Sequence, residues 1–202
     1  MRAFEPFVSM VNRGSDAWRS LGVYDYLWER LAHLLERRGY QPEEIRVVRT
    51  VEDPSVQSYP SEAMKRVAAL AKNKTSPDFR GMAFLFKRVK NITKGLDDSG
   101  ADLAEVKTAL KEPAEVALID QLIVRWPEIE TAIYAGRSSE AIGILSQFRE
   151  PVDRFFTDVM VMSDDPTLRQ ARLAILLRLR SAILKFFGDI SQIVPDEDKA
   201  LV

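Results

Sequence analysis

Apolar residues recur at intervals of three and four positions along most of this chain of 202 residues. That interval places side chains on one face of an α-helix. One such stripe consists of Tyr24, Leu27, Leu31, Leu34 and Leu35, and Gly39 stands where the helix would end. No pair of alternating segments rich in Val, Ile and Thr indicates a β-hairpin. The pattern therefore predicts an all-α protein, a bundle of about seven or eight helices.

Start and stop signals for helices divide the rest of the chain. Proline or a small polar residue begins most of the periodic segments, as at a helix N-terminus. The expected helices cover residues 42–48, 61–74, 77–95, 112–136, 138–148, 150–162 and 165–188, and the polar stretch DDSGAD separates two of them. We expect one helical domain over residues 24–194, preceded by a leading helical segment or linker at 1–23 and followed by a flexible tail at 195–202.

The helix expected over residues 77–95 has two contrasting faces. Its apolar stripe consists of Met82, Leu85, Phe86, Val89, Ile92 and Leu96. Opposite lie Arg80, Lys87, Lys90, Asn91 and Lys94, with Arg88 at the edge and Phe84 among them. Cations that contact phosphates, an amide that bonds a base edge and a ring that stacks on a base are the means by which single-stranded RNA is recognised. The alternative is a solvated face, with Phe84 packed in the core as in many bundle helices.

Charge is unevenly distributed along a chain that is nearly neutral overall. Lys and Arg number 29 against 30 Asp and Glu, so the molecule as a whole is not expected to attract nucleic acid or an anionic membrane. Residues 64–96 nevertheless contain nine basic residues and one acid, Asp78, whereas residues 97–120 contain seven acids and two lysines. The last expected helix is basic again. Such segregation favours one face that meets a polyanion.

The residues that most enzymes need are sparse. The chain has no cysteine, which suits a reducing cytosol, and His33 is its one histidine, without a second imidazole to complete a metal site. The nine glycines form no phosphate-binding motif. Asp164 and Asp165 precede Pro166 and indicate a helix start in preference to a Mg²⁺ site. We therefore expect no catalytic residue, no metal and no cofactor in this chain, and neither export nor membrane insertion.

Five motifs in a fixed order resemble one known family. They are YLWERLAHLLERRGYQPEEIRVV (26–48), FKRVKNI (86–92), LKEPAEVAL (110–118), AGRSSEAI (135–142) and REPVDRFFTDVMVMSDDPTLRQARLAIL (149–176). From about Tyr24 to Val194, the chain resembles the C-terminal region of the β subunit of bacterial glycyl-tRNA synthetase. Two positions differ from the family pattern: Thr157 stands where Asp is usual, and Ala171 where Asn is usual.

The resemblance implies a helical anticodon-binding domain of the kind found in arginyl- and methionyl-tRNA synthetases. In that cytoplasmic enzyme the α subunit carries the catalytic site and uses ATP and Mg²⁺, while the β subunit supplies most of the tRNA contact. The implied partners are tRNA(Gly), the remainder of the β subunit and the α subunit of a hetero-oligomer, and this chain alone should not aminoacylate. The alternative is a helical interaction domain that docks onto the synthetase through FFTDVMVM without reading RNA bases.

Nine residues are the RNA-binding candidates. They are Arg80, Phe84, Lys87, Arg88, Lys90, Asn91, Lys94, Arg169 and Arg172. The helical wheel of the last helix places Arg172 within or beside the apolar arc, where a guanidinium needs a carboxylate. Asp153, Asp158, Asp164 or Asp165 could supply it. A structural ion pair is therefore preferred to RNA contact for Arg172.

Overall fold

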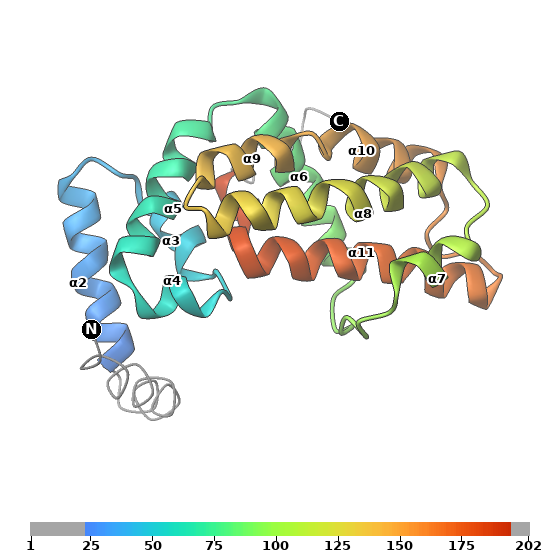
Figure 1. Ribbon diagram of the computed structural model, residues 1–202, viewed down its shortest axis with the longest axis horizontal. Coiled ribbons are helices and arrows are strands. Elements are labelled where there is room, and N and C mark those ends of the chain that lie inside the picture. The colour runs from blue at the N-terminus through green and yellow to red at the C-terminus, as the bar shows by residue number, and fades with distance from the viewer. Residues whose placement is uncertain (1–22, 195–202) are drawn as a thin grey trace. The chain divides into compact units, whose positions relative to one another are not determined.

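The computed structural model describes residues 23–194 (Figure 1). Within this range the chain forms helices and no strand, which confirms the all-α prediction. The chain divides into two compact units, residues 1–42 and 43–202. The expected tail at 195–202, and all of the expected leading segment at 1–23 except its last residue, lie outside the described residues.

The described part of the first unit is helix α2 (Val23–Arg37) and the turn that follows it. Trp28, Leu31 and Leu35 are buried, whereas Leu27 and Leu34 are exposed. The expected stripe was therefore wrong at two positions, because the buried face is narrower and includes Trp28. The helix ends as predicted: Gly39 adopts a φ of 91°, which only glycine reaches without strain.

The second unit contains both short and long helices. They are α3 (Pro42–Arg49), α4 (Pro54–Ser58), α5 (Pro60–Asn73), α6 (Pro77–Ile92), α7 (Leu103–Thr108), α8 (Pro113–Tyr134), α9 (Ser138–Ser146), α10 (Arg149–Asp158), α11 (Pro166–Phe187) and the 3₁₀ helix η1 (Ile190–Ile193). Proline occupies the first turn of most of the predicted helices, as the start signals indicated.

Three short helices were not predicted, and one predicted helix is shorter. Helices α4, α7 and η1 contain four to six residues, too few to show a helical period. Helix α10 ends at Asp158 and not at Met162, because Val159 is extended at φ −117° and ψ 123°. Helix α8 continues through Pro127 to Tyr134.

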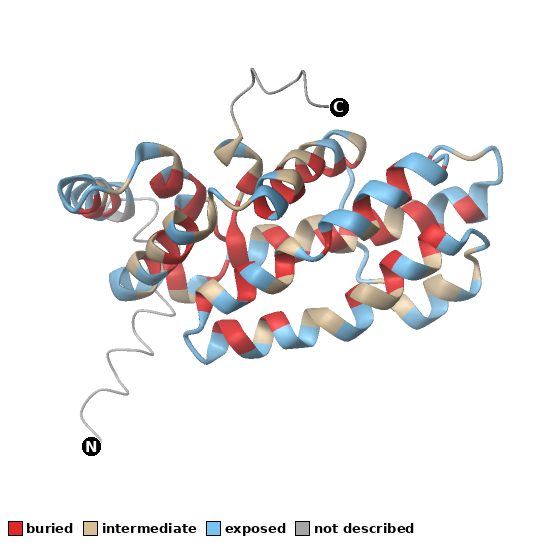
Figure 2. Ribbon diagram, turned by 90° about the horizontal axis from the view of Figure 1, so that it is seen from above, coloured by how far each residue is buried: buried red, intermediate tan, exposed pale blue. Residues whose placement is uncertain are grey.

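The core lies where α6, α8, α9, α10 and α11 pack together (Figures 1 and 2). Its largest fully buried side chains include Phe79, Phe86, Phe148, Phe155 and Phe186. Burying each such side chain contributes about 1.5–3 kcal/mol. Two of these rings belong to α6, so the core fixes which face of that helix remains at the surface.

Candidate nucleic-acid interface

Helix α6 presents the two faces that the sequence predicted. Met82, Leu85, Phe86 and Val89 are buried. Leu96, however, is 39% exposed. Its expected place in the buried stripe was wrong because α6 ends at Ile92 and the chain turns away at Gly95, where φ is 76°.

The opposite face of α6 carries most of the RNA-binding candidates. Arg80, Arg88, Asn91 and Lys94 are exposed, and Lys87 is half-buried. No hydrogen bond or ion pair joins the side chain of Asn91 or Lys94 to another described residue. An amide and an ammonium group are therefore available to a ligand on this face. We call Arg80, Lys87, Arg88, Asn91 and Lys94 the α6 face.

Lys90 is occupied within the protein. Its ammonium group lies 2.5 Å from Asp189 Oδ2 and donates also to Ser191 Oγ. Burial alone would raise the pKa of Asp189, but hydrogen bonds from Lys90, Ser191 and Gln192 outweigh it and lower that pKa. Lys90 thus links α6 to the segment that comes after α11. Its positive charge is largely balanced by the Asp189 carboxylate and is less available to a ligand.

Phe84 is half-buried and lies at the surface. The alternative of a core position for Phe84 is not what the structure shows, because Phe79 and Phe86 take the core positions of this helix. The ring lines a hollow of about 540 Å³, which we call the Phe84 hollow. The other lining residues are Thr75, Pro77, Arg80, Gly81, Leu85, Arg88, Arg149, Asp153 and Val194.

Helix α10 supplies the opposite wall of the Phe84 hollow. Arg149 donates to Asp78 Oδ1 at 2.8 Å and lies across the backbone of Gly81, where an added Cβ would stand 2.6 Å from its Nε. The Arg88 guanidinium lies 4.3 Å from the centre of the Phe156 ring, a cation–π contact. Two arginines from different helices, Arg88 and Arg149, are thereby held in place at the Phe84 hollow.

Sequence reasoning did not identify Arg149, and it named Asp153 only as a partner for Arg172. The available signal was Gly81, because a glycine in the interior of a helix indicates the close approach of another group.

A second hollow of about 710 Å³ adjoins Arg149 and Asp153 of α10. It is lined by Asn73, Ser76, Asp78, Gly143, Ser146, Gln147, Arg149, Glu150 and Asp153.

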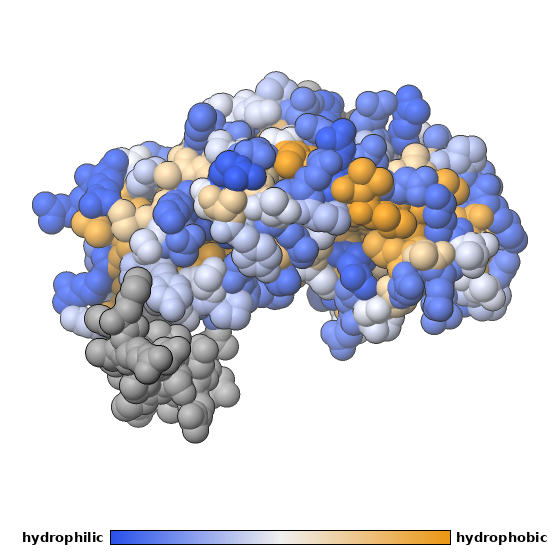
Figure 3. All heavy atoms as spheres, viewed as in Figure 1, coloured by the Kyte–Doolittle hydropathy of each residue, from blue (hydrophilic) through white to orange (hydrophobic). Residues whose placement is uncertain are grey.

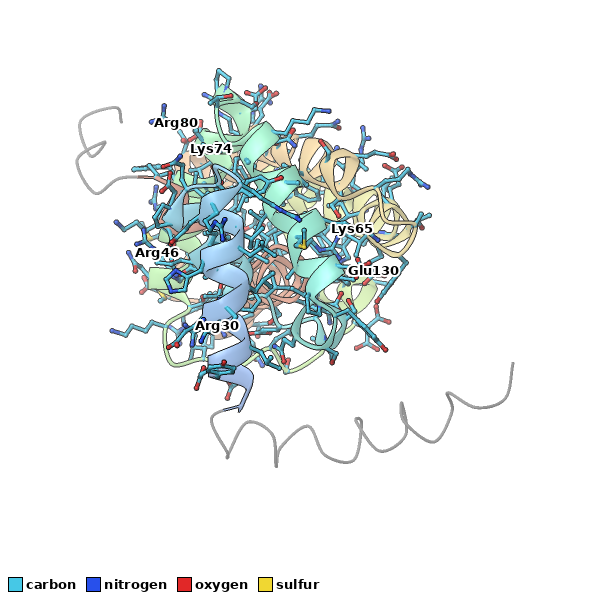
Figure 4. The ribbon with its side chains drawn as sticks, turned by 90° about the vertical axis from the view of Figure 1, so that its left-hand side faces the viewer. Arg30, Arg46, Lys65, Lys74, Arg80 and Glu130 are labelled. Atoms are coloured by element: carbon cyan, nitrogen blue, oxygen red, sulfur yellow. The ribbon has the colours of Figure 1, made fainter. Side chains whose placement is uncertain are left out.

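Several other basic residues of the 64–96 segment are paired with acids. The Lys74 ammonium group lies 2.5 Å from Glu44 and 3.2 Å from Glu43. The hydrogen bond with Glu44 is the main cause that raises the pKa of Lys74, and the bond with Glu43 adds to it. Lys65 pairs with Glu62. Figure 4 labels Lys65, Lys74 and Arg80. The charge run of this segment therefore contributes less positive charge to the surface than its composition indicated.

Arg66 illustrates the same effect inside the protein. It is buried, lies 3.8 Å from Asp53 and donates to Ser138 Oγ. Burial is the main influence on its guanidinium and lowers its pKa. A residue counted among nine basic positions is in this case a core residue that links α5 to α9.

Arg172 is also buried, and its predicted ion pair is confirmed with a different partner. Its Nε donates to Glu115 Oε1, and its Nη1 donates to the carbonyl of Met160 at 2.7 Å. The expected partners Asp153, Asp158, Asp164 and Asp165 were wrong. Glu115 belongs to the LKEPAEVAL motif. Because its guanidinium is buried and bonded to Glu115, Arg172 is not part of the interface.

The Glu115 carboxylate has further donors. The backbone N–H groups of Lys111 and Glu112 each donate to its Oε2 at 2.9 Å. Burial would raise the pKa of Glu115, but these two bonds and Arg172 outweigh it, and the pKa is lowered. The carboxylate is therefore charged, and it caps α8 while it binds α11.

Two other arginines of α11, Arg169 and Arg180, are not part of the α6 face. Arg169 is exposed in the first turns of α11, which lies beside α7 in Figure 1, and donates to the Ser163 carbonyl at 3.2 Å. Arg180 donates to the carbonyls of Thr93 and Leu96 and so fixes the C-terminal end of α6. Arg169 is thus a candidate on a separate surface.

The two positions that depart from the family pattern lie outside the Phe84 hollow. The Thr157 hydroxyl donates to the carbonyl of Asp153 at 2.9 Å, within its own helix. Ala171 is buried. Neither side chain lines the Phe84 hollow.

The described residues provide no metal site and no membrane-spanning helix. Asp165 caps α11 by accepting from Thr167 N and Leu168 N, which confirms the predicted helix start. His33 is exposed and lies 3.7 Å from Glu36. The described part of the chain has no group of three or more His, Cys, Asp or Glu placed to hold a metal ion. None of its helices combines the length and apolarity needed to cross a membrane.

Comparison with known proteins agrees with this geometry. Residues 84–188 match the family described as DALR anticodon binding domain, a span that begins at Phe84 and includes all of α7 to α11. The chain is 35% identical over 169 residues to the glycine–tRNA ligase beta subunit of Dechloromonas aromatica (strain RCB), covering 84% of this chain and 23% of the relative. The resemblance seen in the five motifs is thereby confirmed.

Two further relatives carry the same name. The glycine–tRNA ligase beta subunit of Janthinobacterium sp. (strain Marseille) is 33% identical over 181 residues, 89% of this chain and 25% of the relative. That of Citrobacter koseri is 36% identical over 169 residues, 84% of this chain and 24% of the relative. The chain thus spans about a quarter of the length of the curated relatives that it matches.

Proposed function

The chain belongs to the DALR anticodon-binding domain family, and on that premise we propose that it binds the anticodon stem-loop of a glycine tRNA. The observation that carries the proposal is the α6 face, where exposed cations stand beside the Phe84 hollow. The names of the curated relatives support the choice of glycine tRNA.

Each part of the interface has a distinct role in this proposal. The four cations of the α6 face, Arg88 included, hold the phosphates of the loop, because cations that neutralise phosphates supply most of the sequence-independent affinity for a nucleic acid. Phe84 offers a surface on which an unpaired base stacks. Asn91, with donors and acceptors in one amide, contacts a base or a ribose next to the hollow.

The proposal extends to the enzyme of which the chain is a part. We assign the chain to the β subunit of a cytoplasmic glycine–tRNA ligase, a hetero-oligomer with an α subunit. The chemistry of aminoacylation, with its ATP and Mg²⁺, belongs to the α subunit, and this chain supplies tRNA contact and no cofactor site.

Binding measured against salt tests the proposal. The purified chain is titrated with a glycine tRNA and with a tRNA of another specificity at several salt concentrations. We expect the glycine tRNA to bind more tightly, and its log affinity to fall with log salt at a slope of roughly −3 if four cations contact single-stranded phosphates. Equal affinity for the two tRNAs, or affinity that ignores salt, contradicts the proposal.

A second candidate function, docking onto another part of the synthetase, has one observation in its favour. Met160 and Met162 are 76% and 56% exposed, although Phe155, Phe156, Val159 and Val161 of the same motif are buried. Figure 3 shows further hydrophobic side chains gathered over α8, which carries the exposed Ile123 and Val124. Docking through apolar side chains depends little on salt, so the same titration separates the two functions.

A further inference from the structure

The cations of the α6 face are held in place in two different ways. Lys87 and Arg88 lie within α6, which ends at Ile92, so the hydrogen-bonded turns of the helix fix their positions. Lys94 lies two residues beyond that end, where the chain turns at Gly95 with a φ of 76°. The position of the Lys94 ammonium group therefore depends on what holds this turn.

Arg180 of α11 holds the turn on both sides of Lys94. Its Nη1 donates to the carbonyl of Thr93, and also to the Thr93 hydroxyl at 3.1 Å, while its Nη2 donates to the carbonyl of Leu96. Within the turn, the Leu96 N–H donates to the same Thr93 carbonyl at 3.1 Å. One planar guanidinium thus reaches the two carbonyls that stand before and after Lys94.

Thr93 connects the turn to the core. The residue is fully buried, and its hydroxyl donates to the Val89 carbonyl at 2.7 Å while it accepts from Arg180. The last carbonyl groups of a helix have no partner within the helix, and cations are favoured beside them. Arg180 supplies donors at this end of α6 and thereby ties the turn to a different helix.

Lys94 itself is available to a ligand. Its side chain is exposed and makes no hydrogen bond or ion pair with another described residue, whereas Lys90, one turn earlier, is bonded to Asp189. A lysine side chain has many rotamers, and a loose backbone would add to the conformations that are lost when the ammonium group binds one phosphate. A backbone held by Arg180 removes that part of the entropic cost.

We propose that Arg180 is a positioning residue for RNA binding, which fixes the turn from which Lys94 contacts a backbone phosphate and does not itself touch the RNA. Arg180 is half-buried, and its guanidinium already donates to three acceptors of the protein. The inference rests on the proposed function, because it specifies how one cation of the α6 face is preorganised.

The test replaces Arg180 with lysine, which keeps the charge but lacks the planar fork that reaches two carbonyls at once. Arg178→Lys is the matched control, because Arg178 belongs to the same helix and donates to the Ala101 carbonyl at 3.0 Å, farther along the same segment. The full chain and each variant are titrated over a salt series with a hairpin that carries the anticodon stem-loop of a glycine tRNA. Amide hydrogen exchange at Leu96 reports the turn without RNA.

We expect Lys94→Ala to weaken hairpin binding roughly fivefold at low salt and to flatten the slope of log affinity against log salt by about 0.7, the contribution of one single-stranded phosphate. Arg180→Lys should weaken binding to a similar extent and should speed exchange of the Leu96 amide. Arg178→Lys should leave the affinity and the slope unchanged. In the double variant of Arg180→Lys and Lys94→Ala, the affinity should lie within about twofold of that of Lys94→Ala alone, because the two residues act through one contact.

A merely structural role for Arg180 gives a different pattern. Arg180→Lys would then speed exchange at Leu96 or lower the melting temperature without changing RNA affinity, or it would weaken binding by the same factor with and without Lys94. Either result overturns the positioning role, as does unchanged exchange at Leu96 or unchanged affinity in Lys94→Ala. In each of these cases the unsubstituted chain still binds the hairpin, so the proposed function stands. If the unsubstituted chain does not bind the hairpin, the proposed function itself fails.

Discussion

At the scale of single residues, Arg172 and Glu115 show how a buried charge is retained. Each is almost completely buried: Arg172 donates to Glu115 and to the Met160 carbonyl, and Glu115 accepts also from two backbone N–H groups. A buried pair is not by itself a large net gain, because both charges lose their hydration. Removing one member, however, leaves the other buried without its counter-charge.

Arg172→Met is the variant that exposes this asymmetry. We expect the free energy of unfolding to fall by roughly 3–5 kcal/mol, because Glu115 remains buried without the guanidinium. Urea denaturation measures the loss. Arg169→Met, on the exposed side of the same helix, is the matched control and should change the free energy by no more than about 0.5 kcal/mol. A denaturation curve for Arg172→Met that matches the unsubstituted chain would refute the structural role of the pair.

The same pair predicts a dependence of stability on pH. The pKa of Glu115 is lowered from an ordinary value of 4.5, so its contribution to stability is present above that value and is lost as the pH falls through the lowered pKa. In Arg172→Met, burial acts without the guanidinium and favours the neutral acid. The difference in free energy of unfolding between the two proteins should therefore narrow between pH 7 and pH 4. A difference that stays constant over this range would contradict the assignment.

At the scale of the element, α6 is the helix that connects core to interface. Phe79 and Phe86 anchor it in the core, Arg180 fixes its C-terminal end, and Lys90 binds it to Asp189. Its outer face can therefore hold cations in fixed positions without contributing to the core. Substitutions on that face should affect RNA binding far more than folding.

Replacing Lys87, Arg88 and Lys94 together with Ala tests that separation. We expect RNA affinity to fall and the slope of log affinity against log salt to flatten by about 2, since three phosphate contacts are lost. Stability should change little beyond the cation–π contact of Arg88, which is worth about 0.5–1 kcal/mol at an exposed site. The control replaces Lys65, Lys107 and Arg137, three basic residues outside α6. An equal loss in the control would mean that total charge, and not α6, governs binding.

Gly81→Ala tests the contact between α6 and α10. Alanine in a helix interior normally stabilises by about 1 kcal/mol relative to glycine, but here the new Cβ would stand 2.6 Å from Arg149 Nε and displace that side chain. We expect weaker RNA binding with little net change in melting temperature. Gly143→Ala, which has open space around its Cβ, should raise the melting temperature instead. Full RNA affinity in Gly81→Ala would show that the position of Arg149 is unimportant.

At the scale of the whole molecule, a formal net charge of −1 conceals a surface that is locally cationic. Pairing decides where the positive charge is available: Lys65, Lys74 and Lys90 are matched by acids, while much of the α6 face is open to solvent. Association with RNA should accordingly depend on orientation and on salt, as expected for a local patch.

Replacing both Met160 and Met162 with Gln separates RNA binding from docking at this scale. The two side chains are exposed and do not line the Phe84 hollow, so we expect RNA affinity to stay within about twofold and stability within about 0.5 kcal/mol. A large loss of RNA affinity in this variant would move the interface from α6 to the segment after α10.

The sequence by itself determined the features that depend on neighbours within a turn or two of helix. The all-α class, the helix starts at prolines and at Asp165, and the two faces of α6 follow from local spacing and capping, and the order of the motifs was enough for the family. Tertiary structure alone decided which charges distant in the sequence are paired and which side chains share a hollow. Glu115 and Arg172 are 57 positions apart, and Arg149 and Asp78 are 71 apart. No local period encodes such distances, because they depend on how whole helices pack around a common core.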